Sequence, residues 1–119
     1  MRLRNLAFAV AAFAVLAGFA LAQEGVKTIN GGVLNGKALS LPVPVYPQVA
    51  MRARTGGKVE VEVIVDENGK VISAQAISGP PALRDAAIEA ARRARFSPTK
   101  LSGAPVKVVG LINYNFTLP

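Results

Sequence analysis

The 119-residue chain contains no cysteine and no histidine, and aromatic residues make up only 6% of it. Without thiolates or imidazoles, the commonest zinc ligands, the usual general base and any disulfide framework are absent from the sequence. Acidic residues are also few, since 7 Asp plus Glu stand against 14 Lys plus Arg, for a formal net charge of +7. Most metal and nucleophile chemistry is therefore excluded. We predict no catalytic residue, no metal site and no cofactor.

One long run of apolar residues lies near the N-terminus. Arg2 and Arg4 precede an apolar run that ends at Leu21, within the small-x-small pattern Ala20-Leu21-Ala22 before Gln23. This pattern predicts a secretory signal peptide, residues 1–22, cleaved between Ala22 and Gln23. The alternative is an uncleaved anchor, but a run of roughly 17 residues is at the lower limit for a bilayer core of ~30 Å. We therefore expect an exported protein.

The rest of the chain has room for one domain. Residues 23–42 are rich in glycine and lack periodicity, which predicts a flexible lead-in with at most one short strand, pairing Val33-Leu34 across an Asn35-Gly36 turn. The domain proper is predicted over residues 43–119. Pro47 suits the first turn of a short helix that runs through Ala50 to Arg54.

The centre of the domain is predicted as a hairpin followed by a helix. Residues 58–66 alternate valine with mostly polar residues, and Asn68-Gly69 separates them from a second β-rich run, 71–78. Pro81 then opens an amphipathic helix that reaches Arg95, with a small-residue stripe suited to close packing on a sheet. The residues of that stripe are Leu83, Ala86, Ala87, Ala90 and Ala94.

A long final strand is predicted over 105–118, with a bend or bulge at Gly110. One of its faces carries Val106, Val108, Ile112, Tyr114 and Phe116. The fold class is therefore α+β: a three-stranded antiparallel sheet packed on one main helix, in the order short helix, strand, strand, helix, strand.

Three functions compete on these residues. An enzyme is disfavoured, because the carboxylates alternate on a strand or lie on a helix surface with no partner base. Nucleic-acid binding is disfavoured too, since no aromatic residues interleave with Arg52, Arg54, Arg92, Arg93 and Arg95. A peptide-docking module is favoured, because the final strand carries one charge, Lys107, and an unblunted edge accepts a partner's strand or a second copy of the chain. The alternative is that Lys107, Gly110 and a covering loop already protect this edge.

The ordered residues resemble the C-terminal domain of the TonB family of energy transducers, over residues 43–118. They are Tyr46-Pro47, Ala50, Gly57, Val59, Val61, Val63, Gly69-Lys70-Val71, Ser78-Gly79-Pro80, Leu83, Ala86-Ala87, Ala90, Phe96-Ser97-Pro98, Gly103, Pro105-Val106 and Tyr114-Asn115-Phe116. The resemblance implies a periplasmic domain that binds an extended segment of an outer-membrane, TonB-dependent transporter as an added strand. It assigns the partner-binding residues to Val45, Tyr46, Pro47, Val106, Lys107, Val108, Val109, Gly110, Leu111, Ile112, Asn113 and Tyr114.

The sequence also departs from the family pattern. A complete transducer resembles a membrane anchor with a functional histidine, coupled to a proton-driven motor complex, then a long Pro-rich spacer and this domain. Here no histidine occurs, and the segment from Gln23 to Val45, about 23 residues, spans roughly 80 Å at most. Val45 also stands where the best-known members carry glutamine. We expect a stand-alone exported domain that either binds without supplying force or works beside a separate anchored transducer, through which an inner-membrane motor complex would act. A homodimer or scaffold protein, and a short inner-membrane-anchored transducer, are the alternatives.

Overall fold

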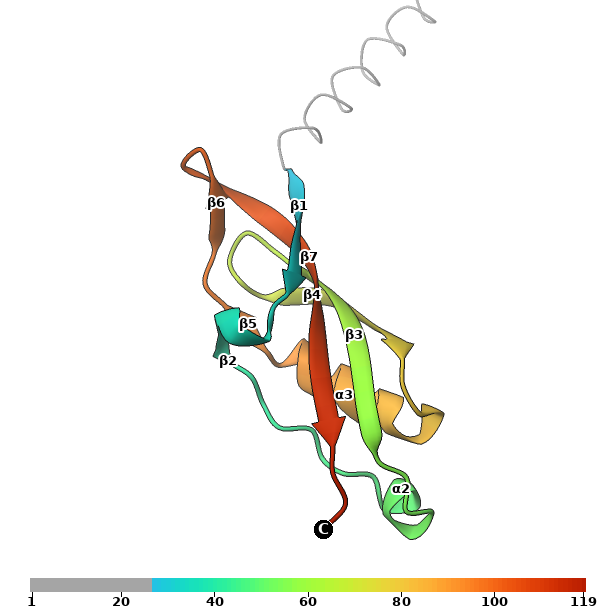
Figure 1. Cartoon of the computed structure of the whole chain (residues 1–119). Coiled ribbons are helices and arrows are strands. Elements are labelled where there is room, and N and C mark those ends of the chain that lie inside the picture. Colours follow the sequence, from blue (N-terminus) through green and yellow to red (C-terminus); the bar gives the residue numbers. More distant parts are fainter. Residues whose placement is uncertain (1–26) are drawn as a thin grey trace, which may run out of the picture.

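The computed structural model describes residues 27–119, and Figure 1 shows their arrangement. The predicted signal peptide, with Ala20, Ala22 and Gln23, lies outside these residues. The order of elements is β1 (Thr28–Val33), η1 (Asn35–Lys37), β2 (Ala38–Ser40), α2 (Gln48–Arg52), β3 (Gly57–Val65), β4 (Val71–Ser78), α3 (Pro81–Arg92), β5 (Arg95–Phe96), β6 (Thr99–Leu101) and β7 (Ala104–Phe116). No helix within 27–119 is long and apolar enough to cross a membrane.

The predicted hairpin and final strand form the centre of the main sheet. β3 pairs antiparallel with β4 on one side and with β7 on the other. The β3–β7 register runs without a shift from Gly57↔Phe116 to Val65↔Val108, so the bulge predicted at Gly110 is absent from this pairing. Asp66 shapes the hairpin tip, because its carboxylate Oδ1 accepts hydrogen bonds from the backbone N–H groups of Asn68 and Lys70, both at 2.9 Å.

The sheet has five strands instead of the predicted three. β1 pairs with β7 in parallel, and β6 pairs with the start of β7 in a tight hairpin. Ser102 and Gly103 form the turn of that hairpin, with φ of 53° and 82°. Two consecutive positive φ values suit the right-handed twist of a two-residue hairpin. Residues 28–40, predicted as a flexible lead-in, thus contribute β1 to this sheet and β2 to a second sheet with β5.

The predicted packing of helix on sheet is present. α3 lies against one face of the sheet, and α2 sits at the lower end in Figure 1, where β3 begins. Leu83, Ala87, Ala90 and Ala94 are fully buried, as are Val59, Val61 and Val63. Because alanine adds little thickness, the helix approaches the sheet closely. The helix ends at Arg92, three residues before the predicted end.

Residues 34–46 complete the core beside α3. Leu34 is buried at 3% exposure, and Ala38, Leu41 and Tyr46 pack against the core cluster. Residues 34–46 therefore belong to the same hydrophobic core as α3 and the sheet.

Candidate docking site

The candidate docking strand β7 has a buried face and a more exposed face. Val106, Val108, Ile112, Tyr114 and Phe116 are buried, which confirms the predicted alternation, and Gly110 is buried with them. Lys107, Val109, Leu111 and Asn113 are half-buried on the opposite face. Along a strand, the backbone groups alternate between the two neighbouring strands. The outward-facing groups of β7 therefore belong to the odd-numbered residues, as the hydrogen bonds below show.

The expectation that β7 is an unpaired edge is wrong over most of its length. β6 pairs with Ala104–Val106, and β1 pairs with residues 107–111. At the start of this contact the Lys107 N–H donates to the Lys27 carbonyl at 2.9 Å, and at its end the Leu34 N–H donates to the Leu111 carbonyl at 2.8 Å. The three-strand prediction failed here because a parallel pairing between residues almost 80 positions apart leaves no local sequence signal.

Leu34 packs directly over Gly110. A Cβ atom built at Gly110 would lie 2.5 Å from the Leu34 Cγ and 2.8 Å from the Gly32 carbonyl oxygen. A Cβ at Gly31 would lie 2.6 Å from a Val108 methyl group. Close approach of β1 to β7 therefore requires glycine on both strands, which gives Gly110 a packing role in place of the predicted bulge.

Asn35 extends the pairing by one residue with its side chain. Its Nδ2 donates to the Asn113 carbonyl at 2.8 Å, and its Oδ1 accepts from the Asn113 N–H at 2.9 Å. A carboxamide has one acceptor and a donor pair, so it matches a backbone N–H and C=O as another strand would. Residues 27–35 together occupy the outward edge of β7 from Lys107 to Asn113.

The predicted residues Val45, Tyr46 and Pro47 lie at the far end of β7. The Tyr46 ring meets the Phe116 ring edge to face, with centroids 5.5 Å apart, and its hydroxyl donates to the Thr55 carbonyl. Val45 is 76% exposed, and Pro47 directly precedes α2. The structure thus brings Tyr46 to the end of β7, away from Val106 and Lys107 at its start.

Tyr114 carries a buried hydroxyl with no hydrogen-bond partner in the described part of the chain. Burial raises the pKa of Tyr114 to about 12, and the nearby positive charge of Arg93 opposes that rise. The neutral phenol is therefore the form held in the core. Sequence reasoning placed Tyr114 on the buried face without identifying this unpaired group.

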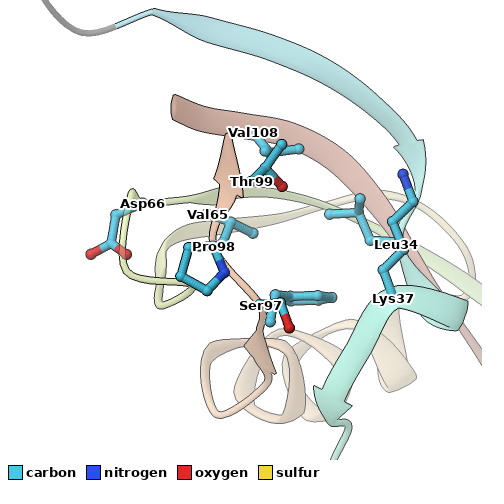
Figure 2. A pocket seen from close by; sticks show the side chains of 9 residues that line it. Leu34, Lys37, Val65, Asp66, Ser97, Pro98, Thr99 and Val108 are labelled. Carbon is cyan, nitrogen blue, oxygen red and sulfur yellow. The ribbon is translucent and has the colours of Figure 1, made fainter. Parts of the chain in front are cut away.

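A cavity of about 210 Å³ lies between η1, the end of β3, the β5–β6 segment and β7 (Figure 2). Its walls are Leu34, Lys37, Val65, Asp66, Phe96, Ser97, Pro98, Thr99 and Val108. It is smaller than most ligand pockets, which measure roughly 300–1,000 Å³. Its Asp66 carboxylate is already engaged by the hairpin turn. Within residues 27–119, no three acidic, histidine or cysteine side chains converge as metal ligands would.

Comparison with known proteins finds a family and a relative that this sequence matches. Residues 42–118 match the family described as Gram-negative bacterial TonB protein C-terminal. Over 65 residues, the chain is 38% identical to Protein TonB of Vibrio cholerae serotype O1 (strain ATCC 39315 / El Tor Inaba N16961). That match covers 53% of the chain and 27% of the relative, so the chain spans about a quarter of that protein's length.

The fold also resembles a solved structure, the solution NMR structure of the Pseudomonas aeruginosa TonB CTD. The TM-score is 0.55 and the sequence identity 28%, over 73% of this chain and 93% of that one.

Proposed function

Because the chain belongs to the family of Gram-negative bacterial TonB C-terminal domains, we propose that it is a periplasmic docking module. It binds an extended segment of an outer-membrane transporter by strand addition, and so supports energised uptake across the outer membrane. Force reaches it from an inner-membrane, proton-driven motor complex through another protein. It binds its partner and catalyses no reaction.

One observation carries this proposal: the outward edge of β7 accepts an extended strand. Residues 27–35 of the same chain lie along it, in parallel, with their backbone and one amide side chain bonded to it. Strand addition uses these same backbone groups for affinity and the adjacent side chains for selectivity. A partner segment would meet Val106 to Tyr114 along the strand and Val45, Tyr46 and Pro47 beyond its end.

The test is binding of synthetic peptides that cover the N-terminal extended segments of outer-membrane transporters. We expect saturable binding, with amide chemical-shift changes concentrated in residues 106–116. A panel of such peptides that leaves every one of these amides unshifted would refute the proposal.

Val109 gives a sharp variant for this assay. The alternation of β7 places its N–H on the outward edge, so Val109→Pro removes one donor from the docking strand. We expect at least tenfold weaker peptide binding, whereas Val109→Thr keeps the N–H and the branched side chain and should bind as the original chain does. Equal affinity of a folded Val109→Pro variant would contradict the assignment of β7.

Among residues 27–119 no strand pairs with the outer edge of β4, and this edge favours a second candidate function, self-association. β4 contains no charged residue, and Ile72 and Ile77 are 52% and 48% exposed. Such an edge readily pairs with another copy of itself. Sedimentation over a range of concentrations should then show a dimer that Ile77→Lys weakens, and a monomer at every concentration would exclude this function.

A short membrane-anchored transducer requires residues 1–22 to persist. Intact mass spectrometry of the protein recovered from membrane and soluble fractions tests this directly. A soluble species that starts at Gln23 supports the exported docking module. A membrane-bound species that retains Leu6 to Leu21 supports the anchored form.

A further inference from the structure

The edge of β7 that the proposed function assigns to a partner is already occupied. Residues 27–35 pair with it from Lys107 to Asn113, through the β1 ladder and the Asn35 carboxamide. Beyond Asn113, only the last residues of β7 remain for an incoming strand. A partner segment of ordinary strand length cannot fit there, since strands usually need about five residues.

We infer that residues 27–35 are an internal competitor for the docking edge, which an incoming segment must displace. The inference rests on the proposed function for its partner, but the competitor itself belongs to this chain. Its chemistry defines what the edge selects: a segment running parallel to β7, with an aliphatic side chain over Gly110 followed by an amide side chain on the backbone of Asn113.

The selectivity follows from the close contacts of Gly110 and Val108. Gly110 leaves a depression that the Leu34 side chain fills, because any Cβ there would meet Leu34 within 2.6 Å. The Val108 methyl group stands where a Cβ of residue 31 would be, so the segment needs glycine three positions before the aliphatic residue. The Asn113 N–H and C=O then require a group that both donates and accepts, as a carboxamide does.

The competitor is held less firmly than the strands of the sheet centre. Leu34 is its only fully buried residue, whereas β3 buries Val59, Val61, Val63 and Val65. Its pairing is interrupted between Asn30 and Gly32. Glycines at 31 and 32 also raise the conformational entropy that the segment regains on release. Elements with few buried apolar contacts open locally at a lower free energy than the whole domain.

Hydrogen exchange of the unmodified protein tests the opening without any partner. We expect the amides of Lys107 and Asn113, which bond to residues 27 and 35, to exchange through a local opening that is insensitive to denaturant. The amide of Ile112 faces β3 by alternation and should exchange only on global unfolding. Identical denaturant dependence for all three amides would overturn the inference.

A reversible crosslink tests competition. Val33 and Leu111 are directly paired across β1 and β7, which places their Cα atoms within disulfide range. The chain has no cysteine of its own, so two introduced cysteines can pair only with each other. In Val33→Cys/Leu111→Cys, oxidation fixes the competitor on the edge and reduction frees it. The probes are a synthetic peptide with the sequence of residues 27–35 and the transporter peptides of the preceding assay.

The oxidised protein should bind either probe at least tenfold more weakly than the reduced protein. The matched control, Glu62→Cys/Gln75→Cys, crosslinks paired residues of β3 and β4 and should bind the probes equally in both redox states. Tighter binding of the residue 27–35 peptide to Leu34→Ala than to the original chain is also expected, because that variant removes the side chain with which the internal strand fills the depression at Gly110.

The outcomes separate the two proposals. Equal binding of a transporter peptide to oxidised and reduced protein would overturn the internal competitor and leave docking at another surface, with the β4 edge as the first to examine. Failure of every transporter peptide, together with redox-dependent binding of the residue 27–35 peptide, would overturn the proposed partner and support the competitor.

Discussion

At Gly110 the absence of a side chain decides whether β1 can lie on β7. In Gly110→Ala, the new Cβ would meet Leu34 and the backbone of Gly32. Overpacking of this kind costs about 1–3 kcal/mol. We expect the variant to lose about that much free energy of unfolding, with amide shifts concentrated in residues 28–35.

The control for this substitution is Gly36→Ala. A Cβ at Gly36 would meet no atom within 4 Å, and its φ is not positive. It should change the free energy of unfolding by less than about 0.5 kcal/mol. A Gly110→Ala variant as stable as Gly36→Ala, with unshifted amides in β1, would show that the packing of Leu34 over Gly110 is unimportant.

Tyr114 links one buried hydroxyl to the pH dependence of stability. Its folded pKa of about 12 exceeds the unfolded value near 10, so the unfolded state loses its proton first as the pH rises. The contribution of Tyr114 to the free energy of unfolding is therefore complete below about pH 10 and is lost as the pH rises toward 12. One pKa unit corresponds to about 1.4 kcal/mol, which limits the loss to about 3 kcal/mol.

Tyr114→Phe removes both the titration and an unpaired buried oxygen. We expect it to be at least as stable as the original chain at pH 7, because an unsatisfied buried hydroxyl is unfavourable. Urea unfolding between pH 9 and pH 11.5 should show a shallower decline for Tyr114→Phe. Parallel declines in the two proteins would mean that Tyr114 does not carry this pH dependence.

Among the elements, the β3–β4 hairpin depends on how its tip meets β5. A Cβ at Gly69 would lie 1.7 Å from the Phe96 carbonyl oxygen, and the Phe96 N–H donates to the Gly69 carbonyl at 2.9 Å. Gly69 and Gly103 have nearly the same φ, 83° and 82°, but a Cβ at Gly103 would meet nothing within 4 Å. Alanine substitutions at Gly69 and at Gly103 therefore separate the cost of a steric clash from the cost of a positive φ.

Gly103→Ala should cost about 1 kcal/mol from its positive φ alone. Gly69→Ala should cost at least about 2 kcal/mol more, because the backbone of Phe96 must move. Thermal or urea unfolding of the two variants measures the difference. Equal losses would mean that the hairpin tip relaxes away from β5 without penalty.

The elements that the sequence predicted well are those with local signals. Alternating valines defined β3, the alanine stripe defined α3, and Pro47 and Pro81 marked the helix starts. The missed elements β1, β2 and β5 depend on contacts between residues far apart in the sequence. β6 was missed as well, although it pairs locally with β7 across the Ser102-Gly103 turn. Gly110 illustrates the limit, since its sequence context indicated a bulge while the reason for glycine, the Leu34 side chain, lies 76 positions earlier.

The same limit applies to the candidate site. The residues of β7 were predicted as the docking strand, and that assignment stays a prediction. A covered edge was weighed only as the alternative, and the covering residues 27–35 were not identified. Leu34 and Asn35 were the missed residues. The one available signal was Leu34 directly before Asn35-Gly36, and it indicated a turn without naming β7 as the partner.

For the whole molecule, the placement of the two ends of the described chain determines how it responds to tension. β1 and β7 are parallel neighbours, and both start at the upper end in Figure 1, while the chain ends at the opposite end. Tension applied between residues 27 and 119 therefore pulls β1 and β7 past each other along their length. In this shear geometry the bonds from Lys107 to Asn113 bear load together, so they must rupture within one event.

We expect single-molecule pulling between these two residues to show release of β1 as a first event, before the β3–β7 ladder opens. That event frees residues 27–37, which is at most roughly 40 Å of extended chain. Leu34→Ala should lower the force of the first event and leave the second unchanged, because Leu34 leaves β7 together with β1 and no longer packs there when the β3–β7 ladder opens. The control Ile72→Ala, at the exposed edge of β4, should alter the force of neither event.

A single rupture of the whole domain, equally strong in all three proteins, would show that β1 is not a separable element under load. It would also remove tension as a means of uncovering the β7 edge.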